Sequence, residues 1–186
     1  MQQIALFLSI LLPLIGPIIY IYEILKKGVR PNRMTRIIFL ILGIITTASL
    51  WVQGSTFSIW LSVVSLFQAV LVFGVSIKYG EGGFNKLDIT VLVIALLGIV
   101  AWKLTDNAFW GLLFALVADF AGLYPTLVKS FKKPWEESYI FYLIDAIASL
   151  LNIIALGTVF SIDAVYSGYL LIVNALVAII ILLRRR

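Results

Sequence analysis

The sequence predicts an all-α integral membrane protein with seven transmembrane helices. Hydrophobic residues make up 62% of the 186 residues and charged residues only 12%. Soluble domains have about 45–50% apolar and about 25% charged residues. Seven apolar stretches approach the roughly 20 residues that a helix needs to cross a bilayer. Short polar breaks separate them, and Lys and Arg gather in every second break. We therefore expect one membrane domain over residues 1–186.

The chain contains no histidine and no cysteine. This excludes disulfide frameworks, thiol redox chemistry, metal ligation through those side chains and every Ser-His-Asp mechanism. We accordingly predict no catalytic residue, no metal site and no cofactor, and we expect that the protein is not an enzyme. The net charge of +5 is assigned to one membrane face, so the expected partner is the lipid bilayer and not nucleic acid.

The predicted spans follow one another with little chain between them. They cover residues 2–25, 37–53, 58–77, 87–105, 108–128, 139–160 and 165–183. The first span has no basic leading segment and is followed by its cations, which favours a permanent helix over a cleaved secretion signal. The breaks after the first, third and fifth spans are basic, whereas residues 54–57, 106–107 and 161–164 carry no cation.

The cations predict the orientation, because Lys and Arg concentrate on the cytoplasmic side of a membrane. Of the fourteen Lys and Arg residues, only Lys103 belongs to the opposite face. The other thirteen are Lys26, Lys27, Arg30, Arg33, Arg36, Lys78, Lys86, Lys129, Lys132, Lys133, Arg184, Arg185 and Arg186. We therefore predict a plasma (inner) membrane protein with its amino terminus outside and its carboxyl terminus in the cytoplasm.

An offset of 106 residues superimposes several features of the two halves. Gly16 falls on Gly122, and Gln68 falls on Asn174; the basic residues after the spans coincide as well. This predicts two parallel three-helix repeats, residues 1–80 and 107–186. A spacer helix over residues 87–105 would return the chain to the starting face, and its interior has one hydroxyl and no charge, which is typical of a lipid-facing helix.

In each proposed repeat the first helix has a proline and then a basic pair: Pro17 before Lys26 and Lys27, and Pro125 before Lys132 and Lys133. Together with the three-one-three arrangement, this resembles the SWEET sugar transporters and the wider PQ-loop superfamily. The resemblance implies a solute carrier. It also implies that Asn174 matches one member of the asparagine pair that grips the ligand in that family, and that Gln68 replaces the other.

Five polar side chains on five helices share one depth in the membrane. They are Thr46, Gln68, Asp119, Asp145 and Asn174. At 1.5 Å per residue, each lies roughly 12–15 Å from the basic flank of its helix. Transporters with repeats bind substrate at this depth. We predict substrate binding by Gln68, Asn174 and Thr46, with Asn152 on the outer approach. Asp119 and Asp145 are candidates for proton coupling or for a polar network.

The leading hypothesis is a carrier for a small polar solute, sugar-like or vitamin-like, with proton linkage as an option. Pro13, Pro17 and Pro125 are the candidate hinges, because proline removes helical hydrogen bonds. Two alternatives stay open. The midplane residues could act as polar contacts between helices, and the protein could be a non-transporting scaffold, an accessory subunit or a receptor-like protein. The sequence also permits a homo-oligomer.

Overall fold

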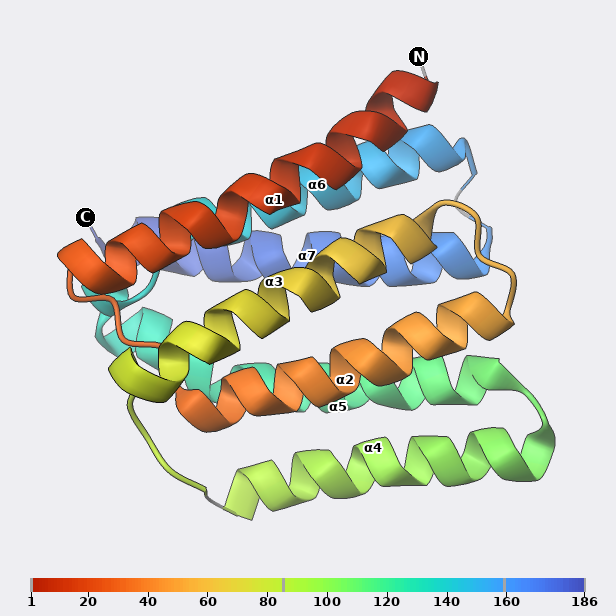
Figure 1. The fold of residues 1–186 in the computed structure, drawn as a ribbon, viewed down its shortest axis with the longest axis horizontal. Coiled ribbons are helices and arrows are strands. Elements are labelled where there is room, and N and C mark those ends of the chain that lie inside the picture. The colour runs from red at the N-terminus through yellow and green to blue at the C-terminus, as the bar shows by residue number, and fades with distance from the viewer. Residues whose placement is uncertain (1, 85, 159, 186) are drawn as a thin grey trace.

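The computed structural model describes residues 2–84, 86–158 and 160–185. Within these ranges the chain forms long α-helices and one short 3-10 helix, η1 (Pro134–Glu136), and no strand (Figure 1). The long helices are α1 (Gln2–Lys26), α2 (Arg33–Val52), α3 (Ser58–Tyr79), α4 (Lys86–Thr105), α5 (Ala108–Lys132), α6 (Tyr139–Leu156) and α7 (Ile162–Arg184). Asn85, Val159 and Arg186, which belong to predicted breaks and spans, lie outside the described residues.

All seven long helices in the described ranges have the length and the apolar composition needed to cross a membrane. Each corresponds to one predicted span, so the prediction of a seven-helix integral membrane protein is confirmed at this level. The exterior of the bundle agrees, because large apolar side chains are exposed along the helices, among them Phe7, Ile44, Phe67, Leu96 and Ile172.

The second helix begins one turn earlier than its predicted span. Asn32 precedes α2, and its side-chain oxygen accepts a hydrogen bond from the backbone N–H of Thr35 at 3.1 Å. Such N-capping satisfies a donor that the first turn would leave free. The helix therefore starts at Arg33, which moves Arg36 from the flank of the span into its first turn.

The sixth helix ends earlier than predicted, at Leu156. Gly157 follows it in the left-handed conformation, with φ of 70°, which is the usual way for glycine to end a helix. The seventh helix begins earlier, at Ile162, because Ser161 accepts a hydrogen bond from the backbone N–H of Ala164 at 3.1 Å.

Successive helices along the chain run in opposite directions (Figure 1). Helix α3 contacts both α1 and α2, and α7 contacts both α5 and α6. These contacts define two groups, α1 to α3 and α5 to α7. Between the two groups, α1 packs on α6 and α2 packs on α5. Helix α4 lies at one edge of the bundle and packs mainly on α5. The loops that follow α1, α3 and α5 gather at the end that holds the carboxyl terminus; the amino terminus lies at the opposite end.

Candidate functional site

A cavity of about 130 Å³ lies among α2, α3, α5, α6 and α7. All five residues that the sequence places at one depth line it: Thr46, Gln68, Asp119, Asp145 and Asn174. A single water needs roughly 10–15 Å³ of such space, and a cavity of roughly 150 Å³ holds benzene. The cavity can therefore hold several waters or one small solute.

Gln68 links three helices beside the cavity. Its Nε2 donates to the carbonyl oxygen of Pro13 on α1 at 2.7 Å and to Oδ1 of Asp145 on α6 at 3.0 Å. Pro17 has no N–H, so the Pro13 carbonyl lacks its normal partner one turn later in the helix. Gln68 supplies that missing donor. Both N–H groups of the Gln68 amide are thus committed, and only its carbonyl oxygen is left for a solute.

Asp119 and Tyr169 link α5 and α7 across the cavity. The Tyr169 hydroxyl donates to Oδ2 of Asp119 at 2.5 Å. Asp119 and Asp145 are only half-buried although both lie in the middle of their helices, and both line the cavity. Each carboxylate therefore has one neutral side-chain donor and presents its remaining surface to the cavity.

Asn174 and Thr46 complete the predicted polar set. Asn174 Nδ2 donates to the carbonyl oxygen of Leu170 on its own helix at 2.9 Å, which leaves its side-chain oxygen for another partner. The Asn174 side chain is half-buried, whereas Thr46 is 6% exposed. Amide and hydroxyl groups both donate and accept hydrogen bonds, so this side of the cavity is suited to recognition of a polar molecule.

Aromatic side chains form much of the remaining wall. The rings that line the cavity are Phe39, Phe141, Tyr142, Tyr166 and Tyr169. Phe141 stacks on Tyr20 with ring centroids 4.9 Å apart and meets Tyr142 edge to face at 5.3 Å. These contacts hold the rings in place, as expected for aromatic pairs at such separations. The cavity therefore has an aromatic wall with acidic and amide groups beside it.

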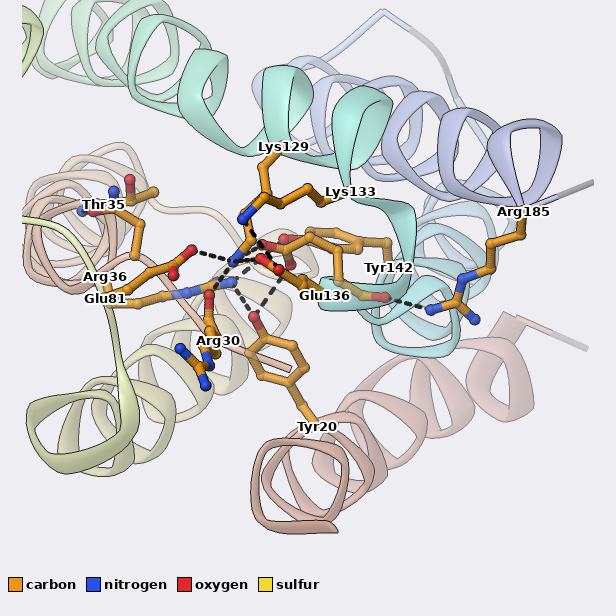
Figure 2. Close-up of polar contacts among 12 residues, drawn as sticks. Tyr20, Arg30, Thr35, Arg36, Glu81, Lys129, Lys133, Glu136, Tyr142 and Arg185 are labelled. Atoms are coloured by element: carbon orange, nitrogen blue, oxygen red, sulfur yellow. Dashed lines mark hydrogen bonds and ion pairs between the residues drawn. The ribbon is translucent and has the colours of Figure 1, made fainter. Parts of the chain in front are cut away.

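One polar network closes the end of the bundle that holds the basic loops, and we call it the inner network (Figure 2). Arg36 on α2 lines the cavity, and its Nη2 donates to the hydroxyl groups of Tyr20 on α1 at 2.7 Å and Tyr142 on α6 at 3.4 Å. All three side chains are buried. Arg36 Nε is also buried and has no hydrogen-bond partner among the described residues.

The inner network continues through Glu137 to Lys129. The Tyr20 hydroxyl donates to Glu137 at 3.3 Å, and Lys129 Nζ lies 3.5 Å from the Glu137 carboxylate. Lys129 also pairs with Glu81 at 3.0 Å, so the α3–α4 loop joins this end (Figure 2). Burial raises the pKa of the Glu137 carboxyl above its ordinary value, while the charges of Lys129 and Arg36 oppose that shift.

A second polar network, the outer network, closes the opposite end. The Ser58 hydroxyl lies 2.9 Å from Oδ1 of Asn152 and 2.7 Å from the hydroxyl of Ser167. Asp163 accepts from the Ser58 backbone N–H at 2.7 Å and from the Ser55 hydroxyl. Ser58, Asn152 and Ser167 are fully buried. Asn152 thus lies toward the outer end as predicted, but it is bound within this network and does not line the cavity.

Three charged side chains were not predicted to lie at the cavity or in the networks. Arg36 was counted with the flanking cations, whereas it is 5% exposed and borders the cavity. The Asn32 cap was the signal that would have placed it inside α2. Glu137 and Asp163 were not singled out from the sequence, and both are buried in the two networks.

The candidate hinges lie within continuous helices. Pro13 and Pro17 are inside α1, and Pro125 is inside α5. None of the three lines the cavity. Hinge motion at these positions stays a prediction.

The groups around the cavity are suited to binding a polar molecule. Within the described ranges there is no group of three or more Asp, Glu, His or Cys side chains placed to hold a metal ion. The cavity instead offers carboxylate, amide, hydroxyl and aromatic groups.

Comparisons with protein-family models, with characterised proteins and with solved structures found no match to this chain.

Proposed function

We propose that the protein is a membrane carrier for a small polar solute, sugar-like or vitamin-like, and not an enzyme. The observation that carries the proposal is the convergence of five polar side chains, from five helices, on one cavity. Polar groups facing lipid would forgo partners at a cost of several kcal/mol. A chamber that accepts water or a solute gives them those partners. Transporters built from repeats bind at this depth.

The helix contacts support two parallel three-helix units, residues 1–80 and 107–186, with α4 as the spacer. In each unit the third helix contacts the first and the second: α3 with α1 and α2, and α7 with α5 and α6. If the two units are exchanged, α1 takes the place of α5 and α6 takes the place of α2. The α1–α6 contact then becomes the α5–α2 contact, and both contacts occur. This is the pattern of a two-fold relation, and it favours the resemblance to the SWEET and PQ-loop carriers.

The two polar networks support alternating access. The inner network joins α1, α2, α5 and α6, and the outer network joins α1, α3, α6 and α7. A carrier needs both ends of its cavity to close and each to open in turn. The buried, unpartnered Nε of Arg36 lowers the cost of opening the inner end, because an unsatisfied buried donor costs about 1–3 kcal/mol in the closed state.

The proposal includes an orientation and a coupling ion. Thirteen of the fourteen basic residues belong to one side in the sequence, which favours an outside amino terminus and a cytoplasmic carboxyl terminus in a plasma (inner) membrane. Asp119 and Asp145 are the candidate proton-coupling residues, because carboxylates inside a membrane mark proton and substrate pathways.

Uptake by proteoliposomes tests this function. Purified full-length protein would be reconstituted, and a panel of labelled small polar solutes would be offered with and without a pH gradient. We expect uptake of at least one solute, loss of its dependence on the pH gradient in Asp119→Asn, and weaker uptake in Asn174→Ala. Thr90→Ala is the matched control, because Thr90 is exposed on α4 and bonds only to its own helix.

Absence of uptake by folded protein for every solute in the panel would contradict the carrier. A non-transporting scaffold, in which the midplane residues only join helices, would then be the better account. Equal transport by Asn174→Ala and Thr90→Ala would leave the carrier in place and contradict the role of Asn174 in binding the solute.

A further inference from the structure

We propose that the solute held in this cavity carries a positively charged ammonium group, which the carboxylates of Asp119 and Asp145 bind within a wall of aromatic rings. This inference rests on the proposed function, since it names the chemical class of the molecule that occupies the same cavity. It narrows the solute from any small polar molecule to an organic cation or a zwitterion.

The first observation is the unbalanced negative charge of the cavity. Asp119 receives a hydrogen bond from Tyr169 and Asp145 receives one from Gln68, and both donors are neutral. In the described part of the chain, neither carboxylate lies within 4.0 Å of a Lys or Arg nitrogen. An ionised group inside a membrane is costly unless it is paired. A bound cation supplies the missing pair.

Arg36 does not supply it, although it borders the same cavity. Its Nη2 is directed to the hydroxyl groups of Tyr20 and Tyr142. The Tyr20 hydroxyl in turn donates to Glu137, so the hydrogen-bond partners of the guanidinium belong to the inner network. Arg36 acts on Asp145 only through its charge, without a direct ion pair. These contacts leave Asp119 and Asp145 as the carboxylates available to an occupant of the cavity.

The second observation is the aromatic wall. Five aromatic side chains line the cavity, and the face of an aromatic ring attracts an ammonium group within about 6 Å of its centroid. Quaternary ammonium groups are recognised by aromatic rings in this way. A neutral polyol could donate its hydroxyl groups to the two carboxylates, but it would leave their negative charge unbalanced.

The third observation is size. The cavity has a volume of about 130 Å³, somewhat less than the roughly 150 Å³ of a cavity that holds benzene. Small alkylammonium ions and the smallest amino acids fit this space in the closed state. The same volume excludes a disaccharide unless the bundle opens further.

Binding to the wild-type chain tests the charge directly. Purified full-length protein in lipid nanodiscs would be titrated with tetramethylammonium and with tert-butanol, which are similar in size and shape but differ in charge and in one hydroxyl group. Propylammonium, propionate and glycine complete the set. We expect the two simple ammonium ions to bind at least about tenfold more tightly than tert-butanol and propionate, because contacts to charged groups exceed neutral ones by this much.

Variants test whether Asp119 and Asp145 form the binding site. Asp119→Asn and Asp145→Asn should each weaken tetramethylammonium binding about tenfold or more. Asp106→Asn is the matched control, because it removes one carboxylate from an exposed position in the α4–α5 loop. Its φ of 51° is a conformation that Asn tolerates. The comparison of tetramethylammonium with tert-butanol uses wild-type protein, so it still tests the inference if one of the cavity variants does not fold.

Equal binding of tetramethylammonium and tert-butanol, or binding of neither, would overturn the inference, and so would ammonium binding that survives both cavity substitutions. If glycine binds more tightly than the two simple ammonium ions, with loss in both variants, the results support the ammonium group and indicate that a zwitterion carries it. Uptake of a neutral solute that Asn174→Ala weakens, without ammonium binding, overturns this inference and leaves the carrier intact. If the protein binds ammonium ions but takes up no solute, the result supports this inference and contradicts the proposed carrier function.

Discussion

Gln68 on α3 donates a hydrogen bond across 2.7 Å to the carbonyl oxygen of Pro13 on α1. That carbonyl lacks a partner in its own helix because Pro17 has no N–H. A side chain of one helix thus repairs the backbone of another, beside the cavity that Gln68 lines. The contact joins the proline-containing segment of α1 to the polar set of the bundle.

Replacing Gln68 should destabilise the protein through this backbone group. In Gln68→Leu the Pro13 carbonyl and the Asp145 carboxylate both lose a donor, and each unsatisfied buried group costs about 1–3 kcal/mol. Pro17→Ala restores a backbone N–H to α1. We therefore expect Gln68→Leu to cost less in the Pro17→Ala background than in the wild type, measured by thermal unfolding in detergent. Equal costs in both backgrounds would contradict the repair.

The outer network should contribute to stability as a unit. Asn152→Ala removes contacts to Ser58 and Ser167 in a fully buried position, so we expect a loss of about 1–3 kcal/mol in the free energy of unfolding. Ser58→Ala should cost about as much. The double variant should cost less than the sum of the two, because they share one network. Additive losses in denaturant titrations would show that the groups act independently.

Glu137 should make stability depend on pH. Burial raises the pKa of its carboxyl above the ordinary value of 4.5, so the folded chain holds this proton more tightly than the unfolded chain. The contribution of Glu137 is then fully present below about 4.5 and declines as the pH rises through the raised pKa. Glu137→Gln stays neutral throughout.

The measurement is the unfolding temperature of both proteins from acid to neutral pH. We expect the unfolding temperature of Glu137→Gln, relative to that of the wild type, to rise with pH. A difference that is constant or falls with pH would contradict the raised pKa.

The orientation has a direct test. A reporter fused after the carboxyl terminus should report a cytoplasmic location, and one inserted at residues 161–164 should report an external one, because the basic loops follow α1, α3 and α5. The measurement is the activity of a reporter that functions on one side of the membrane only. Reporting from the same side at both positions would remove α7 from the set of spanning helices.

Hydropathy and spacing predicted the seven helices and the shared depth of Thr46, Gln68, Asp119, Asp145 and Asn174, and the described residues place all five on one cavity. Both predictions depend on local quantities, since apolar length sets a span and 1.5 Å per residue sets depth. Cap residues such as Asn32 and Gly157 corrected the helix ends. That information was also local and was available in the sequence.

The tertiary structure alone decided which side chains face each other. Depth along a helix does not determine the rotation of that helix about its axis, and rotation depends on packing against neighbours far away in sequence. Packing placed Arg36 against Tyr20 and Tyr142, and it left Asp119 and Asp145 without a basic partner among the described residues. It also separated Asn152 from the cavity. The sequence by itself determined how deep each polar group lies, and the contacts between helices decided which of them share a cavity.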